Sequence, residues 1–383
     1  MKIQLIATCL FGLEKMLGEE IDNLGLKRID TMDGRVTFEG ELSDIPRANI
    51  NFRTAERVYI KMGDFPAKSF EELFEGTKNI PWETYIDKND AFPVKGHAIK
   101  SALYSVPDCQ SIVKKAIVNR LSDAYGIRWF EENETKFQIE FFIFKDVATL
   151  MIDTSGVPLH KRGYRPAAGA APLRETLGAA IAMSTRPREN VLLWDPFCGS
   201  GTIVIEAAMM MKNIAPGLDR HFAAESFKFI PESDWKNARV EARQKIIYNS
   251  EFEAWGSDID EEVLSYAKAN ASRAGVDDVV KFFKADARKI EKPDRRGTLV
   301  CNPPYGERLM TEREVERLYI EMGKTFAKFD PWQMYVLTSS ESFQRHFGRR
   351  ADKIRKLYNG MIPCNLYQYF KPKNQTEQKR SFK

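Results

Sequence analysis

The chain has 383 residues, of which 43% are hydrophobic and 29% charged, and its formal net charge is +4. This length allows two or three domains, and the composition is that of an ordinary globular protein. No run of about 18 apolar residues occurs, so we expect no membrane-spanning helix. Glu14 and Lys15 interrupt the short apolar run at the N-terminus, which argues against a signal peptide.

The cysteines and histidines narrow the class of protein further. The chain has five cysteines, far apart and never in a CxxC pair, which argues against a zinc site and a disulfide framework. This usage favours a reducing cytoplasm as the location. The four histidines are also scattered, so we expect no metal ion. The cysteines are Cys9, Cys109, Cys198, Cys301 and Cys364.

Positive charge is concentrated at the C-terminal end. Residues 345–383 contain eleven lysines and arginines but only two acidic residues. A local charge of this kind suits a polyanion such as nucleic acid. The final segment, residues 371–383, fits a solvated tail equally well, so its order and any contact with RNA stay open.

Residues 1–65 predict a ferredoxin-like domain with the order β-α-β-β-α-β. Apolar residues recur at helical spacing in residues 12–25 and stop at Gly25, and Asp33-Gly34 is a strong two-residue hairpin signal. Residues 2–8 predict the first strand, residues 28–40 the hairpin, and residues 44–65 a second helix followed by a strand.

Residues 66–160 predict a second α/β domain. The apolar side chains of residues 109–126 share one helix face, and two strands separated by Lys145-Asp146 predict a hairpin. The expected elements are short helices in 69–86, a strand in 91–101, the helix 109–126, and strands in 136–144 and 147–156.

Residues 161–383 predict a third, Rossmann-like domain. After a junction rich in proline and small residues, a helix follows Pro172, and strands then alternate with helices. This alternation is typical of a largely parallel, doubly wound sheet. Residues 212–252 are expected to form an insertion that contains a helix. The predicted strands lie in 191–195, 253–260, 279–290, 297–301 and 333–340, with a final pair in 352–359 and 364–371.

Ligands of such sheets bind at the carboxyl ends of the strands, where polar residues follow three predicted strands. Asp195 ends the first strand, and Gly199 and Gly201 make a tight turn into a helix whose N–H groups are available to a ligand. No lysine follows these glycines, as a P-loop requires, and the third glycine of a dinucleotide fingerprint is Val204. A simple strand-to-helix connection explains the turn equally well.

Two further acidic residues follow the next strands. Asp258 is placed to accept both hydroxyls of a ribose, although it lies 63 residues after Asp195 rather than about 20. Helix N-capping is the plain alternative, and Asp260, directly before the helix, fits that role better. Asp286 ends a third strand, where its side chain is placed to meet an adenine amino group.

The segment NPPY, residues 302–305, breaks a buried strand and suggests amine methylation. The lone pair of an exocyclic amine is delocalised into its base, so methyl transfer requires the amine to be held and aimed. The side-chain oxygen of Asn302 and the carbonyl of Pro303 can accept its two hydrogens, and proline makes that carbonyl rigid. Tyr305 offers a flat face on which a base can stack, worth about 1–3 kcal/mol.

These segments together resemble the class I S-adenosylmethionine-dependent methyltransferases. DPFCGSGT (195–202) resembles their cofactor loop, GSDID (256–260) the ribose motif, KADA (284–287) the adenine motif and NPPY the catalytic motif. The longer segments in 162–180, 205–217 and 302–309 are similar to the THUMP-domain RNA methyltransferases, in particular the bacterial 23S rRNA guanine-N2-methyltransferase family. The resemblance implies a ferredoxin-like domain, a THUMP domain in 66–160 and a Rossmann-like domain in 161–383.

The resemblance also implies roles for individual residues. The cofactor would be S-adenosyl-L-methionine, and the target a flipped or single-stranded guanosine of structured RNA, methylated on its N2 amine. Pro172 would close over the cofactor. The implied catalytic residues are Asn302, Pro303, Pro304 and Tyr305. The implied cofactor-binding residues are Asp195, Pro196, Gly199, Gly201, Thr202, Asp258, Ile259, Asp286, Ala287 and Asn302.

Basic residues gather around the junction between the predicted domains. We hypothesise that they hold the RNA backbone, although scattered surface charge is the plain alternative. The favoured partner is 23S rRNA or a ribosomal assembly intermediate, with tRNA as the second choice, and the oligomeric state stays open between a monomer and a weak dimer. The predicted RNA-binding residues are Lys161, Arg162, Arg165 and Arg174, with Arg186 and Arg188 nearby.

Other functions compete with this hypothesis. The NPPY motif also serves adenine-N6 methyltransferases and enzymes that methylate glutamine side chains of proteins, but the latter need no RNA-binding module. A tRNA guanosine-N2 methyltransferase and a catalytically inactive, RNA-binding ribosome assembly factor stay open as alternatives. A nicotinamide oxidoreductase is disfavoured by Val204 and by the long spacing from Asp195 to Asp258.

Overall fold

The computed structural model describes residues 2–165, 173–305 and 311–370. The chain divides into two compact units, and each is described by itself. The first consists of Met1–Cys9, Leu17–Leu159 and Asp219–Val240, and the second of Leu10–Met16, His160–Leu218 and Glu241–Lys383. No helix in the described ranges is long and apolar enough to cross a membrane.

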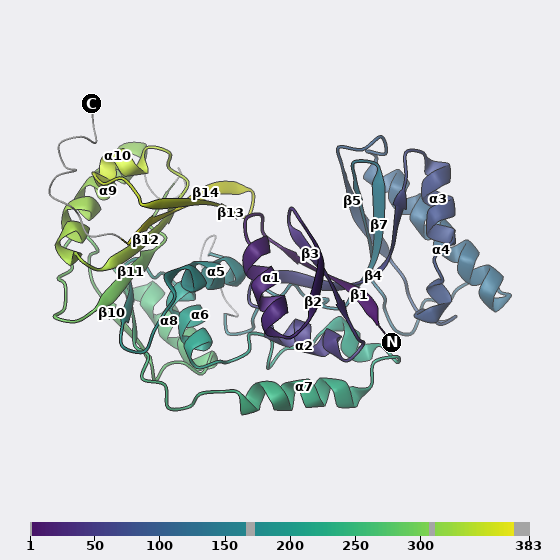
Figure 1. The fold of residues 1–383 in the computed structure, drawn as a ribbon, viewed down its shortest axis with the longest axis horizontal. Helices are drawn as coiled ribbons and strands as arrows, with labels where there is room; N and C mark the ends of the chain where they lie inside the picture. Colours follow the sequence, from purple (N-terminus) through teal and green to yellow (C-terminus); the bar gives the residue numbers. More distant parts are fainter. Residues whose placement is uncertain (1, 166–172, 306–310, 371–383) are drawn as a thin grey trace. The chain divides into compact units, whose positions relative to one another are not determined.

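The first unit is built on a sheet that, in the described residues, has seven strands in the order β2-β3-β1-β4-β7-β6-β5 (Figure 1). All neighbours are antiparallel except β5 and β6. The long strand β4 pairs with β1 on one side and β7 on the other, so it joins the predicted ferredoxin-like and THUMP parts. The strands are β1 (Ile3–Cys9), β2 (Lys27–Met32), β3 (Arg35–Gly40), β4 (Ala55–Pro66), β5 (Val94–Ile99), β6 (Ile139–Phe144) and β7 (Val147–Asp153).

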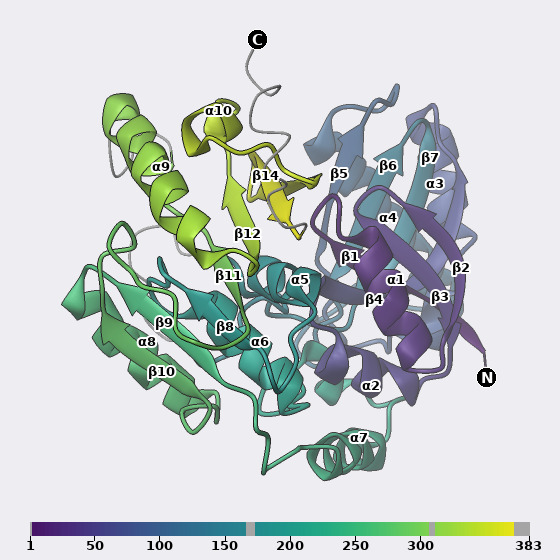
Figure 2. The same ribbon diagram turned by 60° about the vertical axis from the view of Figure 1, so that its left-hand side comes forward.

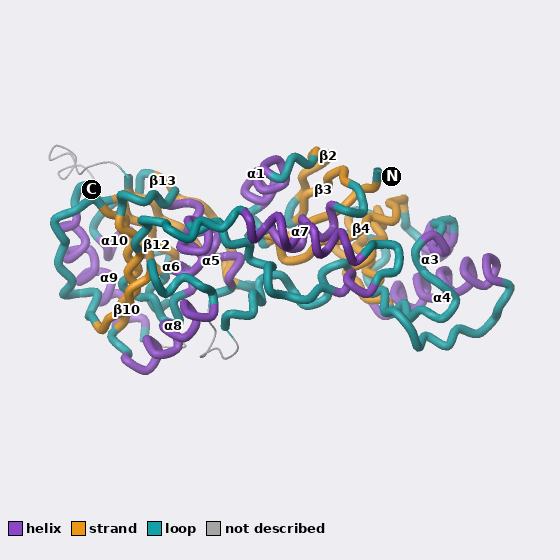
Figure 3. The backbone as a smooth tube through the Cα atoms, turned by 90° about the horizontal axis from the view of Figure 1, so that it is seen from below, coloured by secondary structure: helices purple, strands orange, loops and turns teal. Residues whose placement is uncertain are grey.

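The turns and helices of this unit follow the sequence signals. Gly34 takes the positive φ of 76° that the β2–β3 turn requires. Lys145 and Asp146 both have positive φ, so the β6–β7 hairpin has the type I′ geometry. The helices are α1 (Glu14–Asn23), α2 (Asp44–Asn51), α3 (Phe70–Lys78), η1 (Trp82–Thr84) and α4 (Val106–Tyr125), and α3 packs against α4 (Figure 3).

Residues 219–240 belong to the first unit although they lie far along the chain. Phe227 stacks on Phe137 with ring centroids 4.3 Å apart. The Arg220 guanidinium donates to the carbonyls of Val157 (2.8 Å) and Leu159 (3.0 Å). The segment contains η2 (Ala223–Ser226) and the start of α7 (Glu232–Gln244). The predicted insertion with a helix is therefore present, but most of it packs with the N-terminal sheet.

The second unit contains the predicted doubly wound sheet. In the described residues its order is β10-β9-β8-β11-β12-β14-β13 (Figure 2). Strands β8 to β12 are parallel, and β14 is antiparallel to both of its neighbours. The strands are β8 (Leu192–Asp195), β9 (Ala254–Asp258), β10 (Val280–Lys284), β11 (Gly297–Cys301), β12 (Gln333–Thr338), β13 (Lys353–Asn359) and β14 (Ile362–Tyr369).

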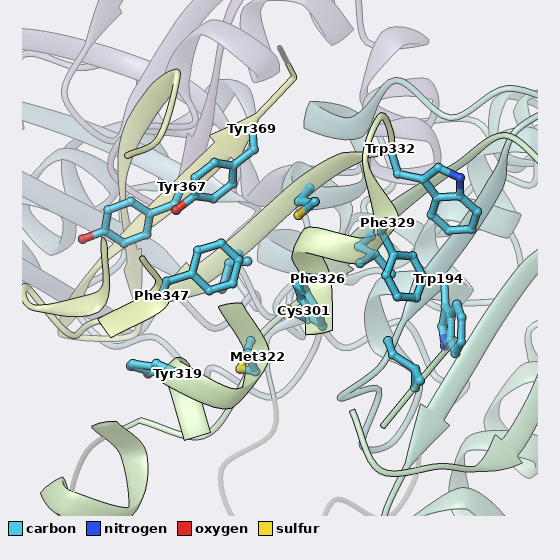
Figure 4. Packing of buried hydrophobic residues seen from close by; sticks show 14 of the residues in the cluster. Trp194, Cys301, Tyr319, Met322, Phe326, Phe329, Trp332, Phe347, Tyr367 and Tyr369 are labelled. Atoms are coloured by element: carbon cyan, nitrogen blue, oxygen red, sulfur yellow. The ribbon is translucent and has the colours of Figure 1, made fainter. Parts of the chain in front are cut away.

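Helices flank this sheet in two groups, as the alternation predicts. Helices α5 and α6 pack together and α6 contacts α8, whereas α9 packs with α10. The side chains of α9 and α10 bury a large apolar core against the strands, and Tyr319, Met322 and Phe326 of α9 belong to it (Figure 4). The α/β fold class is therefore confirmed. The helices are α5 (Glu175–Thr185), α6 (Thr202–Met211), α8 (Glu261–Arg273), α9 (Glu312–Phe326), η3 (Ala327–Phe329) and α10 (Phe343–Phe347).

Candidate active site

Strand register brings four predicted site residues to one edge of the second sheet. Asp195 is paired with Gly256, so Asp258 lies two residues beyond it on β9. Lys284 is paired with Asp258, which places Asp286 two residues beyond the end of that pairing. Trp194 pairs with Leu299, so Asn302 follows the same edge on β11. The strand order reverses between β8 and β11, which is where ligands of doubly wound sheets bind.

The loop 196–201 connects β8 to α6 through two glycines of positive φ. Gly199 has φ 52° and Gly201 has φ 85°, conformations that glycine adopts without strain. Among the residues that the structure describes, a Cβ atom on Gly199 would meet none within 4 Å, so the backbone there borders open space. A Cβ on Gly201 would lie 2.9 Å from the Phe282 ring, so a side chain would force that ring to move. The loop thus leaves room for a ligand beside Gly199.

Neighbouring strands and helices fix this loop by hydrogen bonds. The Cys198 amide donates to the Ser257 carbonyl at 3.0 Å, and the Asn270 side chain donates to the Ser200 carbonyl at 3.0 Å. Thr202 at the start of α6 is buried, and so is Pro196. Asn270, on α8, is a residue that sequence reasoning missed, because no local pattern marks an asparagine within a helix as a loop support.

Asp195 is a carboxyl group almost removed from water. It is 2% exposed, and its Oδ1 accepts a hydrogen bond of 3.0 Å from the Phe197 amide. Burial, with a smaller contribution from the charge of Asp258, raises the pKa of Asp195 to about 8. A buried carboxyl of this kind gains charge readily when a cationic group arrives beside it.

Asp258 joins the glycine loop to the loop after β9. Its Oδ2 accepts from the Gly199 amide at 3.0 Å, and its Oδ1 accepts from the Asp260 amide at 3.1 Å. Asp260 caps α8, because its side chain accepts from the Glu262 amide at 2.9 Å. The structure therefore assigns the capping role to Asp260, as predicted. Ile259 between them is 59% exposed and offers an apolar surface at the same edge.

Asp286 has a partner that sequence reasoning missed. Arg288 binds both of its carboxylate oxygens at 2.8 Å, and this hydrogen bonding lowers the pKa of Asp286. Any further donor must therefore share these oxygens with the guanidinium. Ala287 next to it is 4% exposed. The two-residue spacing to an arginine was visible in the sequence, but it does not by itself predict a bidentate pair.

Asn302 has a buried side-chain oxygen without a partner. Within the described residues, its Oδ1 accepts no hydrogen bond although it is shielded from solvent. Buried polar atoms are nearly always paired, since an unpaired one costs about 1–3 kcal/mol. At the ligand-binding edge of the sheet, this oxygen is available to accept a hydrogen bond from a ligand.

The two prolines after Asn302 are held by the core. The Pro304 carbonyl accepts from the Tyr319 hydroxyl at 3.2 Å, and that hydroxyl also lies 2.8 Å from Thr338 Oγ1. Burial raises the pKa of Tyr319 to about 12, so the phenol remains a neutral donor. Pro303 is buried. These contacts fix the backbone that carries the predicted acceptors.

The phenol of Tyr305 is anchored by the final hairpin. Asn359, the last residue of β13, donates from its side chain to the Tyr305 hydroxyl at 2.9 Å. Cys364 Sγ on β14 lies 3.7 Å from the same hydroxyl, and burial raises the pKa of Tyr305. The Asn359-Gly360 pair is a turn signal in the sequence, but nothing local predicts its bond to Tyr305. Residues 306–310, which complete the GERL segment, lie outside the described residues.

The junction arginines do not fit the predicted contact with RNA. The Arg162 side chain is 2% exposed and pairs with Glu206, which is 0% exposed, at 3.3 Å. The Arg165 side chain is 7% exposed, pairs with Glu175 at 2.9 Å and donates to Thr202 Oγ1 at 2.9 Å. Neither charge is presented to solvent, so both arginines support α5 and α6 instead.

The other predicted RNA contacts keep some exposure. Lys161, Arg186 and Arg188 are exposed, and Arg174 is half-buried. They stay predictions. Pro172, predicted to close over the cofactor, lies outside the described residues.

Family models match three consecutive parts of the chain. Residues 4–59 match an RlmL ferredoxin-like domain, residues 67–153 a THUMP domain, and residues 162–368 an RMKL-like methyltransferase domain.

Two curated relatives match nearly the whole chain. It is 44% identical over 372 residues to "Putative RNA methyltransferase YpsC" of Bacillus subtilis, covering 96% of each chain. It is 36% identical over 366 residues to "Ribosomal RNA large subunit methyltransferase K/L" of Psychromonas ingrahamii, covering 94% of this chain and 49% of that protein. The chain thus spans about half the length of the K/L relatives it matches.

Solved structures agree with this fold. A "predicted N6-adenine-specific DNA methylase" of Listeria monocytogenes has a TM-score of 0.91 at 46% identity, covering 97% of each chain. SMU.472, a "putative methyltransferase complexed with SAH", has a TM-score of 0.91 at 40% identity, covering 98% of this chain and 99% of that chain.

Proposed function

Because this chain belongs to the RMKL-like methyltransferase family, we propose that it methylates the exocyclic N2 amine of a guanosine in structured RNA, most specifically in large-subunit rRNA. The single observation that carries the proposal is the orphaned Oδ1 of Asn302 at the carboxyl edge of β11. The N-terminal THUMP match and the K/L relatives support an RNA substrate.

The residues at this edge fit S-adenosylmethionine, the cofactor of class I methyltransferases. The open space at Gly199 and the exposed Ile259 leave room for it, and Asp195 and Asp258 provide carboxyl groups beside that space. We expect Gly199, Gly201 and Asp195 to hold the methionine part, Asp258 the ribose, and Ile259, Asp286 and Ala287 the adenine end. When bound, the cofactor supplies an electrophilic methyl group on a sulfonium.

Asn302 and the backbone after it would orient the amine. The Asn302 Oδ1 accepts one amine hydrogen and the Pro303 carbonyl the other, which aims the nitrogen lone pair at the methyl group. The Pro304 carbonyl already accepts from Tyr319, so it stiffens the loop. Because the amine nitrogen becomes cationic as it is methylated, these acceptors bind the transition state more strongly than the substrate.

Tyr305 would stack on the target base with its ring fixed at the hydroxyl. The hydroxyl oxygen accepts from the Asn359 side chain, which fixes the ring without a bond to the substrate. A stacked, unpaired base must leave its helix or come from a single-stranded region. This arrangement suits a nucleobase better than the flexible side chain of a protein glutamine.

Adenine-N6 methylation is the second candidate, since a structural relative carries a name of that kind. Mass-spectrometric nucleoside analysis of rRNA and tRNA from cells lacking the gene separates the possibilities. Loss of N2-methylguanosine from large-subunit rRNA is the expected result. Loss from tRNA alone would favour a tRNA enzyme, and loss of N6-methyladenosine would favour the adenine activity. Unchanged modification of both fractions would overturn all three RNA activities.

A further inference from the structure

The β13–β14 hairpin, which anchors Tyr305 through Asn359, also carries exposed apolar side chains at its turn. Asn359 pairs with Ile362, and the turn between them consists of Gly360, with φ 64°, and Met361. Met361 is 94% exposed and Ile362 is 42% exposed. Because β13 runs parallel to β12 and β11, this turn lies at the same carboxyl edge as Asn302.

One face of β13 carries an exposed lysine and a half-buried tyrosine. Lys356 and Tyr358 are two residues apart and therefore share a face. The Lys356 ammonium lies 5.7 Å from the centre of the Tyr358 ring, and Phe11 meets that ring edge-to-face at 5.8 Å. Phe11 is 52% exposed. An exposed ring packed against a half-buried ring beside an exposed ammonium is a combination that can bind single-stranded nucleic acid through stacking and charge.

The loop that carries Phe11 is fixed to β13. Gly12 has φ 89°, and a Cβ on it would lie 2.7 Å from the Lys356 carbonyl, so only glycine allows this approach. The Arg355 guanidinium donates to the Gly12 carbonyl at 2.7 Å, and the Gly12 amide donates to the Glu14 carboxylate at 3.0 Å. Phe11 is therefore presented by a braced loop.

The charge of the hairpin complements a phosphate backbone. From Lys353 to Phe370 the sequence contains three cationic residues and no acidic one. The carboxylate nearest to Phe11 in the chain, Glu14, is engaged by the Gly12 amide. This excess favours RNA over an acidic protein surface, since aromatic stacking adds nothing for carboxylates.

We propose that Phe11, Lys356, Tyr358 and Met361, here called the hairpin surface, bind the RNA strand next to the target nucleotide. The inference rests on the proposed function for the nature of the substrate. Asn359 ends the strand that carries Lys356 and Tyr358, and it holds the tyrosine that stacks on the target base. We therefore expect the nucleotide adjacent to that base to lie at Met361, and the following ones to pass the turn to Tyr358 and Lys356, which lie on the face of β13 opposite to Asn359.

Site-specific photocrosslinking tests the position of the RNA. Met361 in the full-length protein is replaced by p-benzoylphenylalanine and irradiated with large-subunit rRNA from cells lacking the gene. The expected crosslink lies within a few nucleotides of the methylated guanosine. The control carries the same probe at Tyr248, which is 71% exposed and precedes the amino end of β9. A crosslink of equal yield at both positions, or none at Met361, would overturn the inference.

Charge reversal tests the energetic role. We expect Lys356→Glu with Met361→Glu to weaken RNA binding by at least about tenfold and to lower the salt slope by about 1, without changing cofactor affinity. Lys324→Glu with Tyr248→Glu, on exposed positions away from the hairpin, should bind RNA like the parent. If the hairpin variant bound RNA like the parent, the inference that the hairpin surface binds RNA would be wrong, even if the enzyme methylated RNA normally.

The outcomes separate the two proposals. If the parent protein methylates no RNA, the proposed function fails, and RNA retention on filters still decides the surface. A tenfold loss of retention in the hairpin variant would then support RNA docking without that activity, and equal retention would reject it.

Discussion

Two asparagines, one in each unit of the molecule, differ in how their side-chain oxygens are paired. At the end of β7, the Asn49 amide donates to the Ile45 carbonyl and to Thr154 Oγ1, both at 3.0 Å, and its oxygen accepts from Ser155 at 2.6 Å. Thr154 in turn donates to the Val58 carbonyl at 2.6 Å. Asn49 thus uses both ends of its amide inside the protein.

At the carboxyl edge of the second sheet, Asn302 and Asp195 have fewer partners than Asn49. The Asn302 oxygen accepts nothing from the described residues, and Asp195 has a single amide donor at 3.0 Å. We therefore expect Asn49 to stabilise the fold and the Asn302 oxygen to be available to a ligand, because only Asn49 gains its hydrogen bonds on folding. Substitutions at matched positions test this distinction.

The largest effect is expected for Asn302→Ala. The turnover number should fall by at least about 10³-fold, since an oriented hydrogen-bond acceptor is lost in the transition state, while melting temperature and cofactor affinity stay close to the parent values. Single-turnover kinetics, calorimetric binding and thermal unfolding measure the three quantities.

Asn49→Ala is the matched control for that change. It should lower the free energy of unfolding by about 2–3 kcal/mol, because Ser155 and Thr154 lose partners, and leave the turnover of folded protein unchanged. If Asn302→Ala destabilised the protein as much as Asn49→Ala, the oxygen of Asn302 would be a structural group.

Arg162→Ala should destabilise the protein by about 3 kcal/mol, since it leaves the Glu206 carboxylate buried without its cation. Denaturant unfolding measures this loss. Arg57→Ala, which removes the partner of the buried Asp153 in the first unit, is the comparison and should behave similarly. Parent-like stability combined with weaker, less salt-dependent RNA binding would instead restore Arg162 as an RNA contact.

Asp195→Asn should change how stability depends on pH. With a pKa of about 8 in the folded state and 3.8 as its ordinary value, Asp195 takes up a proton on folding between these values. Its contribution to stability is therefore fully present below pH 3.8 and is lost as the pH rises towards about 8.

The amide cannot titrate, so the melting temperature of Asp195→Asn should gain on the parent between pH 5 and 8. In free energy of unfolding, the variant should gain at most about 1.4 kcal/mol on the parent for each pH unit. Relaxation of the site reduces this figure. Thermal melts of both proteins over this range provide the measurement. Parallel curves would show that Asp195 is ionised in the folded protein.

The smallest effect is expected for Asn359→Ala. Loss of the 2.9 Å bond frees the Tyr305 phenol and should lower turnover about tenfold, with cofactor affinity unchanged. Asn365→Ala removes a longer bond of 3.5 Å to Tyr367 in the same hairpin and should leave turnover near the parent value. Equal losses in both variants would point to the stability of the hairpin rather than to the position of Tyr305.

Local pattern was enough to predict most elements of both sheets. Gly25 and Gly126 follow α1 and α4 with positive φ, and the Asp33-Gly34 and Lys145-Asp146 turns lie between paired strands. The gathering of the polar residues that follow these strands was also predictable, because parallel strands present their carboxyl ends at one edge of the sheet.

Long-range partners were not predictable from such patterns. The Arg162 and Arg165 side chains looked like surface charge, since their partners Glu206 and Glu175 belong to helices that the sequence shows only as apolar segments. The same holds for the bond from Asn359 to Tyr305, which joins residues 54 positions apart. Burial and pairing of a polar group depend on tertiary structure, and composition does not reveal them.

Because residues 219–240 belong to the first unit, the chain cannot be cut into two folded fragments at a single position. A fragment that begins at residue 161 would carry Phe227 without Phe137, and Arg220 without the carbonyls of Val157 and Leu159. A fragment that ends at residue 160 would lack the covering ring on Phe137. Neither half is expected to express as a well-behaved protein by simple truncation. A domain exchange with a relative should therefore transfer residues 219–240 together with the N-terminal part.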